Sequence, residues 1–410
     1  MTADPGCRPA VLRSPRLLAR PKQVGGASTR GRIPGSRRTP RRAAATADRP
    51  TDDGRTMRWE SVYVAGTGAW LPEPYPARAA VEAGEYDPEQ WEADGLLSVR
   101  VAGDDVAPPD MAVHAATTAL KRSGVDPGDV RLLLHHYVWF QGQTMWPVAS
   151  YVADHAVHWS VPAFEVKQEC NAAVASLEQA ALRLGAEPGP AAAVLTTADR
   201  FAEPLINRWS AEAGLVYGDG GTALVLSNRG GFARVLSTVT RADNRMEALA
   251  RGAGLTPLPT AEPYDHAARF GHYLRTRGGH VREATDRLIA MVKGAVDTAL
   301  AEADTQASDL AWAVLPTGGR NKMERQAEQL LGVPGERTTW EFGSHAGHLG
   351  AGDQFAALND LAERGRLAPS DRVLMLSAGP GAASCAVLEI TAAPGWAAPA
   401  GGGPSPEAAS

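Results

Sequence analysis

Phe164-Glu-Val-Lys-Gln-Glu-Cys170-Asn-Ala-Ala-Val-Ala-Ser-Leu-Glu-Gln-Ala-Ala-Leu182 joins an extended run to an alanine-rich amphipathic segment, with one cysteine at the junction. The run 161–166 predicts a strand, and the segment after it predicts a helix. We therefore expect the thiol at, or one turn inside, a helix N-terminus, where free N–H groups and the helix dipole favour negative charge. A thiolate stabilised in this way can act as a nucleophile. The alternative is an inert cysteine buried in the core.

The other two cysteines indicate neither a disulfide framework nor a metal site. Cys7, Cys170 and Cys385 are far apart and show no CxxC spacing. This usage fits a reducing, cytoplasmic setting. No apolar run approaches the roughly 20 residues that span a membrane, so we expect no membrane partner.

Charge is spread unevenly along the chain. Residues 1–56 contain twelve Arg and one Lys against four Asp, a net charge of about +9. Since the whole chain has a net charge of −5, the remainder carries about −14. The segment is poor in hydrophobic residues and predicts a disordered basic extension. Its paired arginines lack the apolar run of an export signal, and we do not expect it to bind nucleic acid. We interpret Met57 as the natural start, and residues 1–56 as either foreign to the natural protein or a floppy arm. A second disordered tail is expected over 393–410.

Alternating strand and helix patterns between these ends predict an α/β fold. The segments 110–122 and 284–303 each predict a helix, followed by an acidic turn and an apolar strand, at 130–136 and 311–315. Each half then closes with two strands around a Gly-rich turn, within 214–227 and 372–390. This weak internal repeat predicts two similar halves with a site at their junction. The alternative is a chance similarity among alternating strands and helices.

Several of these motifs together resemble the ketosynthase III (3-oxoacyl-ACP synthase III)-like family of the thiolase fold. They are Met145-Trp-Pro-Val-Ala, Pro162-Ala-Phe-Glu-Val, Cys170, Tyr217-Gly-Asp-Gly-Gly and Gly379-Pro-Gly381. The resemblance covers 57–390. It implies two duplicated βαβ halves, 57–229 and 230–392, each with a five-stranded mixed sheet layered between helices. It also implies a homodimer that loads an acyl group from acyl-CoA or an acyl carrier protein onto the cysteine.

The chain departs from the condensing members of that family at two motifs. Those members carry Pro-His-Gln-Ala-Asn, whereas here the stretch is Pro316-Thr317-Gly-Gly-Arg320, with Thr317 in place of the histidine. They also carry Gly-Asn-Thr-Ser, whereas here the string Gly347-His-Leu-Gly-Ala-Gly-Asp-Gln354 has His348 in place of the asparagine and Asp353 five positions on.

These departures change the expected chemistry. The family uses His and Asn as neutral donors to the enolate of a decarboxylative condensation, which this chain does not supply as a pair. Cys170, His348 and Asp353 instead fit a nucleophile, a base and an orienting acid. The pattern is similar to ketosynthase III-like acyltransferases of bacterial natural-product pathways, so we expect transfer to a hydroxyl, an amine or a carrier-bound acceptor. The alternatives are a condensing enzyme that primes polyketide or fatty-acid synthesis and a non-catalytic synthase partner.

Some of the residue assignments have competing interpretations. His345 is the alternative base to His348, and Asp353 can also serve as the first-turn acid of the helix that follows it. The backbone N–H of Cys170, with one from the loop Gly379-Pro-Gly381, is expected to form the oxyanion hole.

The remaining assignments concern the substrates. Thr317 is interpreted as a filler or a hydrogen-bonding pocket residue, and Trp146 as a wall of the acyl pocket or part of the core. No cofactor or metal is expected beyond the phosphopantetheine of the acyl-CoA or carrier-protein donor. The acceptor is expected to be a small molecule.

Overall fold

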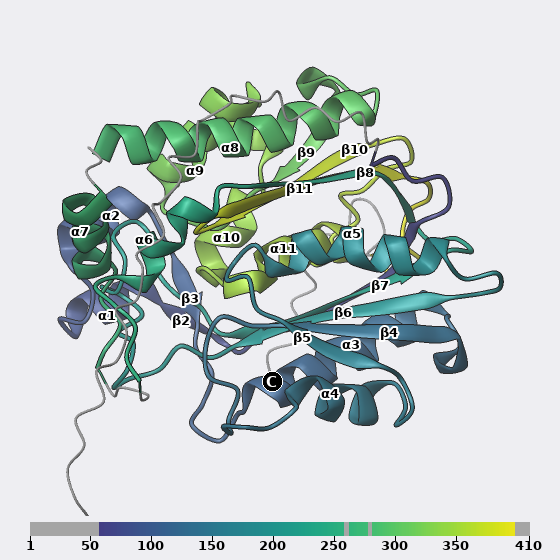
Figure 1. Ribbon diagram of the computed structural model, residues 1–410, viewed down its shortest axis with the longest axis horizontal. Coiled ribbons are helices and arrows are strands. Elements are labelled where there is room, and N and C mark those ends of the chain that lie inside the picture. Colours follow the sequence, from purple (N-terminus) through teal and green to yellow (C-terminus); the bar gives the residue numbers. More distant parts are fainter. Residues whose placement is uncertain (1–56, 258–261, 278–280, 398–410) are drawn as a thin grey trace, which may run out of the picture. The chain divides into compact units, whose positions relative to one another are not determined.

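The computed structural model describes residues 57–257, 262–277 and 281–397 (Figure 1). The predicted extension 1–56 and residues 398–410 of the predicted tail lie outside this part. Within the remainder of that tail, Trp396 packs edge-on against Phe232, with ring centroids 5.4 Å apart. None of the helices in the described ranges has both the length and the apolar character of a membrane span.

Nine of the strands in the described residues form one mixed sheet with the order β5-β4-β6-β7-β1-β8-β11-β10-β9, and β2 pairs with β3 apart from it. The strands are β1 (Tyr63–Trp70), β2 (Pro74–Pro76), β3 (Ser98–Arg100), β4 (Val130–His136), β5 (Ala163–Val166), β6 (Ala192–Asp199), β7 (Gly220–Ser227), β8 (Ala233–Ala242), β9 (Leu310–Val314), β10 (Arg372–Gly379) and β11 (Ala382–Ile390).

The two halves of the large sheet repeat the same pairing. In the first, β1 is antiparallel to β7, β7 antiparallel to β6, and β6 parallel to β4. In the second, β8 is antiparallel to β11, β11 antiparallel to β10, and β10 parallel to β9. Only a short antiparallel contact between β1 and β8 joins them. The duplicated α/β architecture expected from the internal repeat is therefore present.

The halves differ in their fifth strand. In the first half, β5 runs parallel to β4 at the edge of the sheet. At the corresponding place in the second half, the described residues contain only an isolated parallel bridge between Ala313 and Thr338, directly after a single turn over Gly335–Arg337. Here Pro334 has no N–H to donate to a strand ladder, and the turn that follows it ends the extended backbone. The expected five strands are thus found in the first half, and four in the second.

Helices cover both outer faces of the folded sheet and fill the space between its halves (Figure 1). Helix α3 packs on β1 and β7, helix α8 packs on β8 and β11, and α5 contacts strands of both halves. The helices are α1 (Ala77–Glu82), α2 (Pro88–Asp94), α3 (Pro108–Ser123), α4 (Val148–Ala156), α5 (Ala172–Gly185), α6 (Ala248–Arg251), α7 (His266–Arg277), α8 (Val281–Glu302), α9 (Arg320–Gln326), α10 (Trp340–Ala346) and α11 (Asp353–Glu363).

The two central helices, α5 and α11, are built for burial on several sides. In α5 the alanines at 172, 173, 180 and 181 are fully buried, and small side chains let a helix lie close to two sheets. Helix α11 buries nine of its eleven residues. Both helices contact strands of the two halves. The loops that enter these helices carry the predicted catalytic residues.

Candidate active site

The turn before α5 presents the predicted nucleophile. Cys170 lies two residues before the first helical residue, Ala172, and its side chain is only half-buried. Glu169 precedes it with φ at +49°, a left-handed backbone conformation that non-glycine residues rarely adopt. The Ser377 hydroxyl donates a 2.6 Å hydrogen bond to the Cys170 carbonyl oxygen. The thiol thus lies at a helix start, as the sequence predicted, at the end of a tightly held turn.

A continuous polar chain joins the cysteine to the loop before α11. The Cys170 Sγ lies 2.9 Å from His348 Nε2. His348 Nδ1 lies 2.6 Å from Asp353 Oδ2, to which it donates because a carboxylate only accepts. Asp353 is 1% exposed and also accepts from the backbone N–H groups of Thr317 and Leu349, each at 2.7 Å. These bonds fix the carboxylate, and through it the tautomer and orientation of the imidazole.

The backbone of His348 is clamped to a neighbouring segment. His348 donates to the Val216 carbonyl at 2.7 Å and accepts from Gly218 N–H at 2.9 Å. A Cβ on Gly218 would lie 2.2 Å from the Ala346 carbonyl oxygen, and Gly347 has φ at +72°. Glycine is therefore required at both positions for the two segments to approach. The glycines of these motifs position the imidazole.

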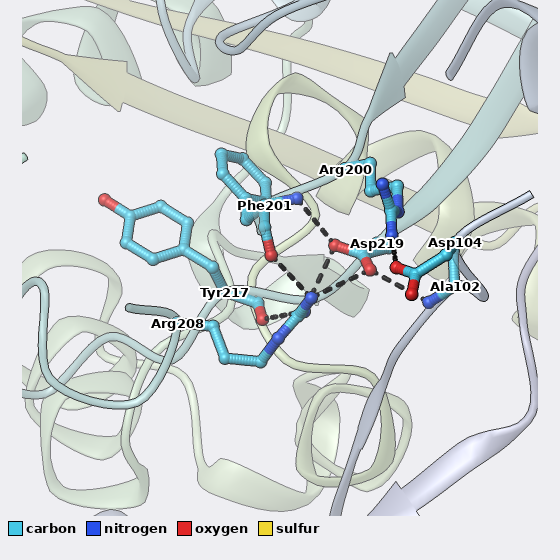
Figure 2. Close-up of polar contacts among 7 residues, drawn as sticks. All are labelled: Ala102, Asp104, Arg200, Phe201, Arg208, Tyr217 and Asp219. Atoms are coloured by element: carbon cyan, nitrogen blue, oxygen red, sulfur yellow. Dashed lines mark hydrogen bonds and ion pairs between the residues drawn. The ribbon is translucent and has the colours of Figure 1, made fainter. Parts of the chain in front are cut away.

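A buried ion pair anchors the segment that clamps His348 (Figure 2). Arg208 donates to Asp219 Oδ1 and Oδ2, at 3.1 and 2.9 Å, and to the Tyr217 carbonyl at 3.0 Å. Asp219 is fully buried and also accepts from the backbone N–H groups of Phe201 and Ala102. A buried charge pair with this many hydrogen bonds holds its surroundings in one geometry. The Tyr217 ring, on the same segment, lies 5.6 Å from the His348 ring.

The electrostatics of the site favour a protonated imidazole beside the cysteine. Burial by itself lowers the pKa of His348, but the Asp353 carboxylate, the charge of Cys170 and the hydrogen bonds to both outweigh it, and the pKa is raised well above its ordinary value. A thiolate and an imidazolium stabilise each other in such a pair. The arrangement can therefore hold a nucleophilic sulfur with an acid at 2.9 Å from it.

The triad opens onto a cavity of about 640 Å³. Its walls near the cysteine include the aromatic side chains of Trp139, Phe201, Tyr217 and Tyr264. The carboxylates of Glu169 and Glu212 line it too, with several cationic side chains. A cavity of this size, mostly apolar with a few polar groups, can enclose an acyl group and part of a second substrate.

The structure brings most of the predicted site residues to this cavity. Cys170, His348, Thr317 and Gly379 line it, and Asp353 stands directly behind His348. The α-carbon of Gly379 faces the 168–171 turn, since a Cβ there would lie 3.6 Å from the Asn171 backbone nitrogen. Thr317 contributes its backbone N–H to Asp353.

Three other residues lie away from the cavity. Gly381 is next to the backbone of Asp243 and is not part of the cavity wall. Trp146 packs against Tyr151, with centroids 5.4 Å apart, as part of the core rather than an acyl pocket. The exposed His345 ring lies 3.4 Å from the Ser98 hydroxyl, so of the two candidate bases His348 is the one at Cys170.

Several cavity residues were not predicted from the sequence. Glu169 directly precedes Cys170, but no sequence signal indicates the left-handed backbone that places it at the cavity. Tyr217 belongs to a motif that carries the family resemblance without an assigned role, and no pattern marks Trp139 or Tyr264 individually. Only their place in the folded chain identifies them.

Groups outside the triad show no sign of metal chemistry in the described ranges. There, no three His, Cys, Asp or Glu side chains are arranged to hold a metal ion. His135 and His136 are fully buried neutral residues, because burial lowers their pKa values to about 4 and about 3. Burial raises the pKa of the Cys385 thiol far above its ordinary value, which keeps it unreactive.

The chain is similar to known proteins in sequence and in fold. Residues 300–390 match the family model "3-Oxoacyl-[acyl-carrier-protein (ACP)] synthase III C terminal". The chain is 27% identical over 338 residues to acetoacetyl CoA synthase NphT7 of Streptomyces sp. (strain CL190), covering 80% of this chain and 98% of that one. It is 36% identical to the solved acyltransferase ChlB3, with a TM-score of 0.77, over 82% of this chain and 100% of that one. The fold is shared with 3-oxoacyl-[acyl-carrier-protein] synthase III of Aquifex aeolicus, at 19% identity and a TM-score of 0.64.

The duplicated layered fold and the cysteine at a helix start define a thiolase-fold enzyme that acts on acyl groups. The chain belongs to the ketosynthase III-like family of that fold.

Proposed function

We propose that the protein is an acyltransferase of bacterial secondary metabolism, which loads an acyl group on Cys170 and passes it to a hydroxyl, an amine or a carrier-bound acceptor. The observation that carries the proposal is the unbroken chain from Cys170 Sγ through His348 to Asp353, with separations of 2.9 and 2.6 Å. Both ring nitrogens of His348 are engaged in this chain. Because Asp353 holds the proton on Nδ1, the Nε2 of the neutral imidazole accepts a proton, whereas a condensing site requires donors to a thioester enolate.

In the first half-reaction, the Cys170 thiolate attacks the carbonyl carbon of the donor thioester. The backbone N–H of Cys170 and that of Gly379 are the proposed donors to the oxyanion. The tetrahedral intermediate collapses by breaking the bond to the donor sulfur. The His348 imidazolium gives its proton to that leaving thiolate, which leaves acyl-Cys170 and a neutral imidazole.

In the second half-reaction, the same imidazole works in reverse. Acylation removes the charge of Cys170, one of the influences that raise the pKa of His348, so the imidazole becomes free to accept a proton. It takes the proton of the acceptor hydroxyl or amine while the acceptor oxygen or nitrogen attacks the thioester. Cys170 leaves as a thiolate, and the starting ion pair is restored. Asp353 keeps Nδ1 protonated throughout.

The donor is proposed to be acyl-CoA or an acyl carrier protein, whose phosphopantetheine needs no further cofactor, and the site of action the cytoplasm. A homodimer is also proposed. Strand β5 is an open edge of the large sheet, and its Phe164 is 57% exposed. An unpaired edge with an exposed aromatic side chain favours pairing with a second copy.

A decarboxylative ketosynthase is the second candidate. It is favoured by the match of residues 300–390 to a synthase III model and by the similarity to NphT7. The two functions differ in one measurable product. Incubation with a malonyl donor would release carbon dioxide and give a ketoacyl product only if the protein condenses, and that result would overturn the acyltransfer proposal.

Intact-mass spectrometry tests the proposal directly. A panel of acyl-CoA and acyl-carrier-protein donors should add one acyl mass to the wild type and none to Cys170→Ala. His348→Ala should still acquire some acyl group but fail to pass it on, whereas His345→Ala, which alters a histidine away from the cavity, should behave like wild type. Absence of any mass gain would sink both enzymatic functions.

A further inference from the structure

Glu169 is a carboxylate in the cavity to which no described residue donates a hydrogen bond. It lines the cavity directly beside Cys170 and is partly buried. Within the described residues its side chain makes no hydrogen bond and no ion pair, whereas Glu212 accepts a 3.1 Å hydrogen bond from the Tyr217 hydroxyl. A partly buried carboxylate that lines a cavity and has no donor from the protein is available to a donor on a bound molecule.

The turn before α5 fixes the position of Glu169 at the cavity. Glu169 has φ at +49°, and its carbonyl accepts from Ala172 N–H at 3.1 Å to start the helix. Any residue at this position is presented to the same cavity as the nucleophile. Asparagine or glycine would tolerate the left-handed backbone better, so the glutamate stands here against its conformational preference.

The two cations that act on the charge of Glu169, Lys167 and Arg269, make their close contacts with other residues. Burial raises the pKa of Glu169, and the charges of Lys167 and Arg269 oppose that rise from a distance. The Lys167 ammonium lies over the Tyr137 ring, 5.4 Å from its centroid. The Arg269 guanidinium lies 4.6 Å from the Tyr264 centroid and donates to the Ala250 carbonyl at 2.8 Å. Neither cation forms an ion pair with Glu169, so its charge is left for a ligand.

We propose that Glu169 is an acceptor-binding residue, and that the acceptor carries a second hydrogen-bond donor, a protonated amine or a hydroxyl, next to the hydroxyl that is acylated. This inference rests on the proposed acyl transfer. With Glu169 adjacent to Cys170, the second donor of the acceptor binds the carboxylate while its nucleophilic hydroxyl reaches the acyl carbonyl and His348.

Two matched pairs of small alcohols test the inference. 2-(Dimethylamino)ethanol and 3-methylbutan-1-ol have the same shape, but only the first carries a protonated amine. Ethane-1,2-diol and propan-1-ol differ only in the second hydroxyl. The acyl mass on Cys170 is followed after addition of each alcohol, in the wild type, in Glu169→Gln and in Glu165→Gln. Glu165 serves as the control because it is a carboxylate of β5 that accepts from Tyr137 and lies off the cavity.

The readout is the ratio of rates within each pair, so changes in loading or folding cancel. We expect the donor-bearing alcohol to react about 10–100-fold faster in at least one pair, as for a hydrogen bond to a charged group. The ratio should fall towards one in Glu169→Gln and persist in Glu165→Gln. The pair that responds identifies the ammonium or the hydroxyl as the second donor. Ratios near one in the wild type, or unchanged in Glu169→Gln, overturn the inference.

A binding measurement separates this failure from failure of the proposed function. Each alcohol is also tested for slowing the alkylation of Cys170 by iodoacetamide. If no acyl-enzyme forms, the proposed acyl transfer fails, yet selective protection by the donor-bearing alcohol, lost in Glu169→Gln, would still support the binding role. Equal protection by both members of each pair would refute it.

Discussion

Replacing Asp353 with asparagine should separate its catalytic role from its role at the start of α11. The carboxylate accepts three hydrogen bonds, from His348 Nδ1 at 2.6 Å and from the backbone N–H groups of Thr317 and Leu349 at 2.7 Å each. Asparagine has one accepting oxygen and one donating NH₂. Whichever way the amide is turned, its NH₂ must face at least one backbone N–H at a distance that suits only an acceptor.

The magnitude follows from these contacts. If the oxygen stays on Leu349, the NH₂ faces His348 and drives the imidazole to the tautomer with its proton on Nε2, which cannot accept the acceptor's proton. If the amide is reversed, the Leu349 N–H is left facing a donor. We expect acyl transfer to fall by about 10²–10⁴-fold, or about 3–5 kcal/mol at about 1.36 kcal/mol per tenfold. A buried donor left unsatisfied should also cost about 1–3 kcal/mol of unfolding free energy.

The assay follows both half-reactions by intact mass, with acetyl-CoA as donor and ethane-1,2-diol as acceptor. Because Asp353 raises the pKa of His348, its loss lowers that pKa. Imidazolium is lost as pH rises through the pKa, so the alkaline limb of the loading rate should move to lower pH. Glu89→Gln is the matched control, since Glu89 lies in the first turn of α2 and is remote from the triad. Rates within threefold of wild type, with an unmoved limb, would show that Asp353 serves only the helix.

Three further changes test the reactive sulfur, the anchoring ion pair and the buried histidines. Iodoacetamide should modify Cys170, and Cys385→Ala should leave that labelling intact because burial already makes Cys385 unreactive; labelling lost in Cys385→Ala would contradict this. Arg208→Met strands a buried carboxylate and should lower the unfolding free energy, read from urea titration, by about 3–5 kcal/mol, against about 0–1 kcal/mol for Arg78→Met in an exposed pair. Burial lowers the pKa of His136 from the ordinary 6.5 to about 3, so its contribution to stability is full above pH 6.5 and falls as the pH drops towards 3. His136→Gln should therefore flatten the pH dependence of the unfolding free energy, read from urea titration, by up to about 1.36 kcal/mol per pH unit in that window. An unchanged slope would refute the buried neutral state.

Local patterns were sufficient for much of the fold. The strand predicted at 130–136 is β4, and the helices predicted at 110–122 and 284–303 lie within two or three residues of α3 and α8 at every end. Each of these segments has a clear apolar periodicity, and its tertiary contacts leave the predicted secondary structure unchanged. The second half has no fifth strand in the described residues, because a turn over Gly335–Arg337 ends the extended backbone at that place.

Candidate site residues could be predicted where a local sequence motif marks them, but not where only the folded chain brings them to the cavity. Cys170, His348 and Asp353 could be named because a helix start and a motif departure marked them. The sequence left Trp146 as either a pocket wall or part of the core, and its side chain packs onto Tyr151 in the core. No sequence pattern reports that a side chain faces a cavity when its backbone is left-handed, which is why Glu169 went unnoticed.

The duplicated topology explains why the site has this form. The same pairing order in both halves places the loop before α5 and the start of α11 at one junction, the first carrying the proposed nucleophile and the second the proposed acid–base pair. The 2.9 Å contact of Cys170 with His348 therefore depends on both halves packing around the two central helices. In the proposed mechanism, loading discharges the thiolate and thereby weakens the hold of His348 on its proton, so one imidazole serves as acid first and base second. A condensing site instead needs donors to an enolate, and this is the difference that the malonyl-donor experiment measures.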